Sequence, residues 1–399
     1  MSSKDETKKT EPDLKFKEIE GGLQSLLEDL LETKYVKHAV IALEKGDGSF
    51  SWIGVEGKAD PDWNPMQWDT PFWIASVTKL FIAAAILKLH EEKSLSIEDS
   101  MAAYLPQDLI QGLHRWKDGK DYTNEITLLH LLGHSSGLPD YLEVHPRGEK
   151  SLYDIVLEEG DSSWTIREIL KIIKEVNKPL FPPQPLQSRK KRIRYSDTNY
   201  QLLIAVIQAV TGKTLHEVFQ KMFYGPLDLR ETFHPGEKPL GSTLPPAAVW
   251  YQDRPLFIPK AMKSFGDLNS TAKDLLKFMR ALIGGQVFQE PATGDLMVGE
   301  WNRFGFSVSP VGPGWPIEYG LGMMRFRMPR LITPLRPLPE VIGHTGACGS
   351  WLFYCPSLDM YLTGTVSQVT ASPVPFRFLP KVLSFLKSKF NSQELGILP

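Results

Sequence analysis

The sequence places a serine and a lysine three residues apart at the start of a strongly apolar segment. From Leu80 to Leu89 only Lys88 is polar, which predicts a helix buried on nearly all sides. Ser76 and Lys79 are three residues apart at the start of this helix and would lie on the same helix face. A serine hydroxyl needs a neighbouring base or cation to become a nucleophile, and a helix N-terminus adds partial positive charge. The alternative is a chance S-x-x-K pattern in a core helix.

A second candidate element is the segment Arg194–Tyr200, which contains Tyr195 and Asp197. A lysine ammonium lowers the pKa of a neighbouring tyrosine and favours its phenolate. Tyr195 would then take the proton of Ser76 and later deliver it to the leaving group, while Asp197 would hold the lysine. The alternative is an ordinary loop in which Asp197 or Thr198 caps the following helix.

A third element is the glycine-rich segment Gly343–Gly349, which follows two apolar residues. Glycines beside a strand allow a substrate backbone to approach closely. A backbone N–H from this strand, together with the N–H of Ser76, would form an oxyanion hole. The alternative is a strand end in which His344 has only structural hydrogen bonds.

The composition indicates a folded protein that binds neither nucleic acid nor an anionic membrane. The chain has 399 residues, 42% of them hydrophobic, which is enough for a large core or two lobes. Its 45 basic and 47 acidic residues leave a formal charge of −2. The two cysteines, Cys348 and Cys355, and the polar N-terminus predict a reducing, cytoplasmic location. No run is long and apolar enough to span a bilayer.

Hydrophobic periodicity predicts an α/β protein with two lobes. Residues 1–13 are predicted to be a flexible tail, 14–105 and 258–399 an α/β sheet domain, and 106–257 a mainly helical domain. Helices are expected near 16–31, 76–89, 166–176, 200–210, 271–284 and 376–390, and strands near 38–43, 50–55, 320–326, 341–344, 351–354 and 360–366.

Taken in order, S-x-x-K, Y-S-D and H-T-G match the three active-site elements of the penicillin-recognising serine hydrolases. The chain resembles the branch that contains class C β-lactamases, DD-peptidases, D-aminopeptidases and β-lactamase-like esterases. Residues 126–141, ITLLHLLGHSSGLPDY, are similar to the family's HLLTHTSGLPDY segment. The segment YSDTNY at 195–200 resembles its YSNTNY, and YGLGM at 319–323 resembles its YGLGW. The resemblance extends from about residue 36 to about residue 386.

The resemblance implies a β-lactamase/transpeptidase-like fold: a mixed, mainly antiparallel sheet flanked by helices, plus a helical lobe. The active site would lie in the cleft between the two. Ser76 would be the acylated nucleophile, with proton transfer shared by Lys79 and Tyr195. The substrate-binding and oxyanion positions would be Asp197, His344, Thr345, Gly346 and the backbone N–H of Ala347.

Two positions depart from the family pattern. Asp197 stands where many members have asparagine, and His344 stands where most β-lactamases have lysine. A histidine is mostly neutral at pH 7, so a cation that would bind a β-lactam carboxylate is lost. Both departures argue against a dedicated β-lactamase and favour neutral ester or amide substrates, or substrates with a basic group.

We therefore expect a cytoplasmic serine hydrolase, a carboxylesterase or amidase that works through an acyl-enzyme without cofactor or metal. Its partners would be small ester, amide or peptide substrates, and the sequence favours no oligomeric state. The alternatives are a D-aminopeptidase, a DD-peptidase, a weak β-lactamase, or a sensor that binds an acyl donor and turns over slowly.

A rival nucleophile is Ser135, because Gly133–Gly137 fits the G-x-S-x-G elbow of α/β-hydrolases. With Asp197 and His344 it would even complete the order Ser, Asp, His. An elbow needs a strand before it and a helix directly after it, whereas Leu138-Pro139-Asp140 predicts a turn. We therefore interpret Ser135 as a turn residue.

Two other motifs have a structural and a functional interpretation. His130 and His134 are four apart, a spacing that can bind zinc, but no third ligand is apparent in the sequence. The basic run Arg189–Arg192 is either a solvated loop or a frame of positive charge around the active-site mouth.

Overall fold

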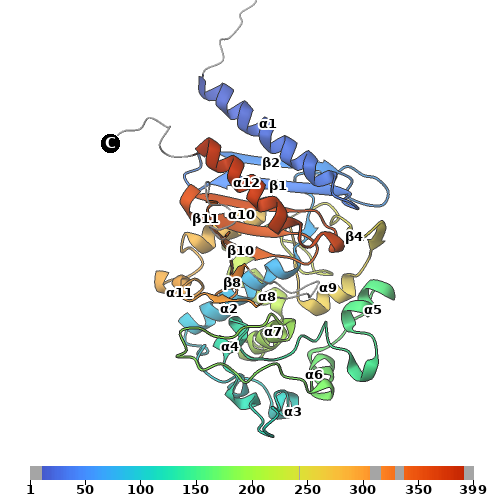
Figure 1. The fold of residues 1–399 in the computed structure, drawn as a ribbon, viewed down its shortest axis with the longest axis vertical. Coiled ribbons are helices and arrows are strands. Elements are labelled where there is room, and N and C mark those ends of the chain that lie inside the picture. Colours follow the sequence, from blue (N-terminus) through green and yellow to red (C-terminus); the bar gives the residue numbers. More distant parts are fainter. Residues whose placement is uncertain (1–10, 242, 306–315, 329–336, 391–399) are drawn as a thin grey trace, which may run out of the picture.

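A computed structural model describes residues 11–241, 243–305, 316–328 and 337–390 (Figure 1). At its centre is an eight-stranded sheet with the order β2-β1-β12-β11-β10-β9-β8-β7. Every pairing within it is antiparallel, where the sequence led us to expect a mixed, mainly antiparallel sheet. Its strands are β1 His38–Lys45, β2 Ser51–Gly57, β7 Asn302–Arg303, β8 Ile317–Tyr319, β9 Met324–Phe326, β10 Val341–Thr345, β11 Trp351–Cys355 and β12 Met360–Thr365.

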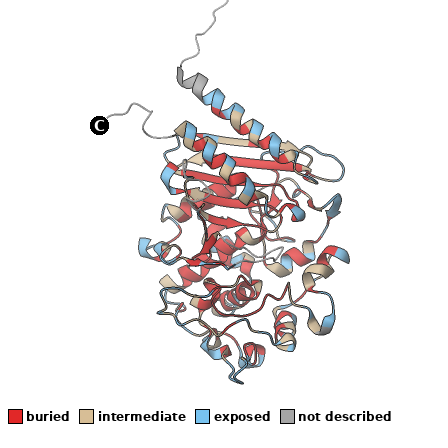
Figure 2. Cartoon of the chain, in the orientation of Figure 1, coloured by how far each residue is buried: buried red, intermediate tan, exposed pale blue. Residues whose placement is uncertain are grey.

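Both faces of this sheet are covered by helices (Figures 1 and 2). Side chains alternate between the faces of a strand, so in β1 Ile41 packs toward α1 and α12 while Val40 and Ala42 pack toward the rest of the molecule. The helices are α1 Glu11–Leu31, α2 Thr78–Glu91, α3 Gln107–Ile110, α4 Leu128–Leu132, α5 Leu152–Glu158, α6 Ile166–Val176, α7 Asp197–Thr211, α8 Leu215–Phe219, α9 Pro259–Phe265, α10 Ala272–Ile283, α11 Pro291–Asp295 and α12 Val374–Phe390.

Two short pairs of strands lie outside the main sheet. Strand β3 (Phe72–Trp73) pairs with β6 (Asn269–Ser270), and β4 (Val249–Tyr251) pairs with β5 (Arg254–Leu256). The first pair is important for the site, because it joins the segment before Ser76 to the segment after α9.

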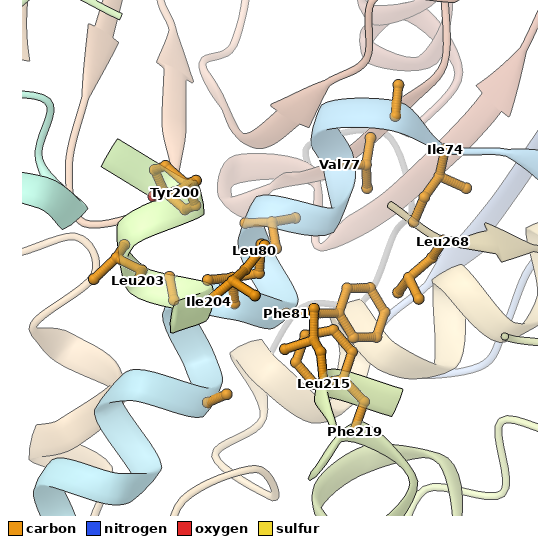
Figure 3. Close-up of a cluster of buried hydrophobic side chains, with 14 of the residues drawn as sticks. Ile74, Val77, Leu80, Phe81, Tyr200, Leu203, Ile204, Leu215, Phe219 and Leu268 are labelled. Atoms are coloured by element: carbon orange, nitrogen blue, oxygen red, sulfur yellow. The ribbon is translucent and has the colours of Figure 1, made fainter. Parts of the chain in front are cut away.

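Helix α2 is buried on nearly all sides, as its sequence predicts. Its residues Leu80 and Phe81 lie among apolar side chains of α7 and α8, including Leu203 and Phe219 (Figure 3). The ring of Phe81 also stacks on Phe278 of α10 with centroids 3.6 Å apart. This packing places the start of α2 between the sheet and the helical segments.

Most predicted elements are confirmed, and one strand is wrong. Residues 320–326 were expected to be one strand, but residues 320–323 form the turn of the β8–β9 hairpin, in which the Gly320 N–H donates to the Met323 carbonyl at 2.8 Å. Gly322 takes a φ of 74° there, a left-handed conformation that glycine adopts without strain. Of the predicted tail 1–13, residues 1–10 lie outside the described residues, and α1 begins at Glu11.

Among the described residues, no single helix is long and apolar enough to cross a membrane. Helix α7 and the segment Leu215–Tyr224 reach that length and composition only together, with a bend of 76° between them. Their side chains Leu202 and Phe219 are fully buried in the core.

Candidate active site

Ser76 lies in a short 3₁₀ turn, Ala75–Val77, that leads directly into α2. Ala75 has a left-handed φ of 47°, which costs about 1–2 kcal/mol for a residue other than glycine. The two neighbours of Ser76 in the chain, Ala75 and Val77, are buried, whereas Ser76 itself is partly exposed and lines a pocket. The strained turn therefore presents the serine hydroxyl at a surface of the core.

Lys79 contacts both the nucleophile candidate and an acid. Its Nζ lies 3.0 Å from the Oγ of Ser76 and also donates a hydrogen bond to Oδ1 of Asp197. The side chain of Lys79 is only 5% exposed, and that of Asp197 is 18% exposed. A salt bridge so shielded from water constrains the position of the ammonium beside the serine.

Tyr195 completes this group of contacts. Its ring centre lies 5.0 Å from Nζ of Lys79, and Ser76 and Lys79 both act to lower the pKa of its hydroxyl, which places that hydroxyl close to the two side chains. His134 holds the segment in place, because its carbonyl accepts from the Arg194 N–H at 3.0 Å and its Nδ1 accepts from the Ser196 N–H at 3.3 Å. The three predicted catalytic residues therefore lie together around the Lys79 ammonium.

The protonation states differ from those that we expected from the sequence. Burial raises the pKa of Tyr195 more than the Lys79 ammonium lowers it, so its hydroxyl stays protonated at neutral pH. The prediction of a stabilised phenolate is therefore wrong for the free protein. Burial lowers the pKa of Lys79, but Asp197, Tyr195 and Asp267 outweigh this effect and raise it above its ordinary value.

The end of β10 and the following turn lie against the segment that carries Ser76. Ser350 Oγ donates to the Ile74 carbonyl at 2.8 Å, and Cys348 Sγ donates to the Trp73 carbonyl at 3.1 Å. Gly346 makes this approach possible, since a Cβ there would lie 2.5 Å from the Ile74 carbonyl oxygen. As a result, Ala347 lines the same pocket as Ser76.

His344 and Thr345 are buried rather than part of the pocket lining. The Thr345 carbonyl can only accept, so Nδ1 of His344 donates to it at 2.7 Å, and Nε2 accepts from the Tyr319 hydroxyl at 3.1 Å. Burial lowers the pKa of His344 to about 3, so the ring is neutral. Thr345 Oγ1 lies 3.8 Å from the sulfur of Met324. The structure thus brings Ala347 to the pocket but not these two side chains.

The pocket at Ser76 has a volume of about 70 Å³, and most of the side chains that line it are apolar. Its lining comes from α2, from the helices α5, α7 and α9, and from the turn that follows β10. Besides Ser76, Lys79, Asp197 and Ala347, the lining residues are Trp73, Ala75, Ile82, Tyr141, Leu142, Tyr153, Val156, Leu157, Tyr200, Gln201, Leu256, Ile258, Phe265, Asp267 and Val369.

Sequence reasoning assigned no role to two acids in this region. Asp140 accepts the Asp197 N–H at 3.0 Å, and burial together with the Asp197 charge raises its pKa well above the ordinary value. Asp140 lies in the LPDY end of the segment 126–141, so this motif could have indicated it. Asp267 lines the pocket, but no motif surrounds it, so only the fold reveals it.

The rival site at Ser135 does not assemble. Ser135 is 2% exposed and follows α4 in a turn, in which its N–H donates to the His130 carbonyl. Asp197 instead pairs with Lys79, and His344 pairs with Tyr319. The residues 133–137 are therefore a structural turn.

The other two motifs also have structural partners. His130 caps α4 through Nδ1, which accepts the Thr127 N–H, and its Nε2 lies 2.6 Å from the Gln184 carbonyl. In the basic run, Lys191 pairs with Glu300 at 2.6 Å. None of the residues 189–192 is among those that line the Ser76 pocket.

Comparison with known proteins agrees with this geometry. The profile of the Beta-lactamase family matches residues 23–376. Penicillin-binding protein 4* of Bacillus subtilis is 24% identical over 371 residues, which are 85% of this chain and 68% of that protein. Esterase EstB of Burkholderia gladioli is 26% identical over 316 residues, 70% of this chain and 74% of that protein. D-amino acid amidase from Ochrobactrum anthropi has a similar fold, with a TM-score of 0.69 at 20% identity over 92% of this chain and 99% of its own.

Proposed function

Because the chain belongs to the Beta-lactamase family, we propose that it is a serine hydrolase that forms an acyl-enzyme on Ser76. The observation that supports the proposal is the proximity of three groups. The Ser76 hydroxyl and the Lys79 ammonium are 3.0 Å apart and line one pocket, and the Tyr195 ring lies 5.0 Å from that ammonium. This is the arrangement that a nucleophilic serine requires, since each proton it loses or returns has a neighbour to carry it.

The proton of Ser76 needs a base, and both neighbours hold their own protons in the free protein. We infer that Lys79 passes a proton to Asp197 as it takes the proton of Ser76, so that the acid serves as the final acceptor. The direct hydrogen bond between Lys79 and Asp197 supports this route. Tyr195, beside Lys79, would then deliver its proton to the leaving group and regain one from Lys79, which takes back the proton held by Asp197.

The developing oxyanion would be stabilised by two backbone N–H groups, those of Ser76 and Ala347. No carbonyl among the described residues accepts the Ala347 N–H, so this donor is available for a ligand. Removing one such donor from a hydrolase typically costs about 100- to 1000-fold in rate. After acyl transfer, water would release the acid and restore Ser76.

The substrates that we propose are small esters or amides, including short peptides. The small, mostly apolar pocket supports this class, and relatives are named as an esterase and a penicillin-binding protein. His344 is buried and neutral, so it supplies no positive charge for a substrate carboxylate. This supports substrates that do not need a cation at this position.

The nucleophile is tested by intact mass spectrometry after incubation with a fluorophosphonate and, separately, with a penicillin. We expect a single adduct on Ser76, its loss in Ser76→Ala, and its retention in the matched variant Ser135→Ala. Steady hydrolysis of p-nitrophenyl esters should follow the same pattern. An adduct that survives Ser76→Ala, or disappears in Ser135→Ala, would contradict the assignment.

A slow-turnover acyl-binding sensor is the second candidate. It is favoured by one observation, namely that the pKa values of Lys79 and Tyr195 both lie above their ordinary values, so neither is a ready base. A burst assay with p-nitrophenyl esters separates the two functions. Release of one equivalent followed by a stall indicates the sensor, whereas steady turnover indicates the hydrolase.

We also propose a cytoplasmic location. Cys348 and Cys355 are both free and buried, which is consistent with a reducing compartment. Fractionation of the source cells, with detection of the full-length chain, tests this location.

A further inference from the structure

The lining of the Ser76 pocket holds one more acidic than basic side chain. Three of the described residues that line it are charged: Lys79, Asp197 and Asp267. Lys79 and Asp197 pair with each other, which leaves Asp267 as the acid in this lining without a salt-bridge partner. An ionised carboxylate in an apolar pocket is costly unless a cation joins it.

One oxygen of Asp267 is used and the other is open. Oδ2 accepts the indole N–H of Trp73 at 3.1 Å. Among the described residues, Oδ1 has no hydrogen-bond donor, and no cation lies within 4.0 Å of the carboxylate. Burial raises the pKa of this group to about 7, although Lys79 acts in the opposite direction, so a nearby ammonium would favour its ionised form.

The backbone fixes Asp267 relative to the nucleophile. Its neighbour Leu268 accepts the Ile74 N–H at 3.0 Å and donates to Thr78 Oγ1 at 3.1 Å. These two bonds lie on either side of Ser76 in the chain (Figure 3 labels Ile74 and Leu268). These bonds hold the backbone next to Asp267 against the turn that presents the serine hydroxyl. The Asp267 side chain therefore lines the pocket in which a scissile bond would meet Ser76.

We propose that Asp267 binds a protonated amine of the substrate, so that this enzyme acts on acyl donors with an ammonium group close to the scissile carbonyl. The proposal rests on the proposed function and deepens it by naming the substrate class. The substrate ammonium would donate to Oδ1 of Asp267 while its carbonyl carbon meets Oγ of Ser76. The pocket would then contain two cations and two anions.

The test uses two p-nitroanilides that differ only in the amine: leucine p-nitroanilide, as each enantiomer, and 4-methylpentanoyl p-nitroanilide. We expect kcat/KM to be about 10- to 100-fold higher for one leucine enantiomer, the range for a hydrogen bond between charged groups. Asp267→Asn should abolish this preference, because asparagine still accepts the Trp73 N–H but carries no charge. The control Asp29→Asn removes a charge from α1, where Asp29 pairs with Lys381, and should keep the preference.

Equal rates on both compounds, or a preference that survives Asp267→Asn, would overturn the proposal. If neither compound is cleaved, the proposed function is in doubt, and binding decides the present question separately. Calorimetry with Ser76→Ala should then show leucinamide binding more tightly than 4-methylpentanamide, and the double variant Ser76→Ala/Asp267→Asn should remove the difference. Equal binding by Ser76→Ala would refute the role of Asp267.

Discussion

Replacing Gly346 by alanine should damage the site through space alone. A Cβ at this position would lie 2.2 Å from Ser350 Oγ, 2.5 Å from the Ile74 carbonyl oxygen and 3.0 Å from the Ala75 Cβ. Ordinary contact begins near 3.4 Å, so the backbone oxygen alone requires a shift of about 0.9 Å. The end of β10 and the Ser76 turn would have to separate by a comparable distance.

The expected loss follows from that displacement. A misplacement of about 1 Å between reacting groups lowers rates by about 100-fold, and overpacking a well-filled site costs about 1–3 kcal/mol. We therefore expect Gly346→Ala to lower the rate of fluorophosphonate labelling and the kcat for p-nitrophenyl esters by about 100-fold. Urea denaturation, followed by tryptophan fluorescence, should show a stability loss of about 1–3 kcal/mol.

Gly21→Ala is the matched control. Gly21 lies in α1, and no atom lies within 4 Å of the position that a Cβ would take there. Alanine should therefore raise helix stability by about 0.5–1 kcal/mol and leave labelling unchanged. If Gly346→Ala labels at the wild-type rate and is equally stable, then β10 does not approach the Ser76 turn as described, and the oxyanion role of Ala347 loses its basis.

Two further predictions concern protons. Tyr195→Phe should lower kcat for esters more than it raises KM, because it removes a proton carrier and leaves the shape of the pocket unchanged. The control Tyr354→Phe, which removes a hydroxyl that contacts Asp359, should change neither constant. An effect of Tyr195→Phe on KM alone would refute its role in proton transfer. Burial lowers the pKa of His38 from 6.5 to about 4, so its neutral form stabilises the fold above pH 6.5 and that stability is lost as the pH falls through this window. The free energy of unfolding should fall by about 3 kcal/mol across this pH range. In His38→Asn the slope of the unfolding free energy against pH should flatten. An unchanged slope would show that His38 is not the group responsible.

The sequence by itself determined the local geometry of the nucleophile. Ser76 and Lys79 are three residues apart, so any helical turn at this point brings them together, and the contact of 3.0 Å needs little from the rest of the fold. Helix ends such as Gly212 after α7 were predictable for the same reason, because a left-handed cap depends on a few neighbouring residues. The order of the three motifs also predicted the family.

Only the tertiary structure decided which distant groups share the pocket and which protons they hold. Asp197 is 118 residues from Lys79, and Asp267 is 194 residues from Trp73, so their contacts depend on how α7, α9 and β6 pack around α2. The charge state of Tyr195 was predicted wrongly because burial, which the whole fold sets, outweighs the one neighbouring cation that the motif indicates. Spacing along a chain specifies short-range contacts, whereas desolvation depends on every element that excludes water from the group.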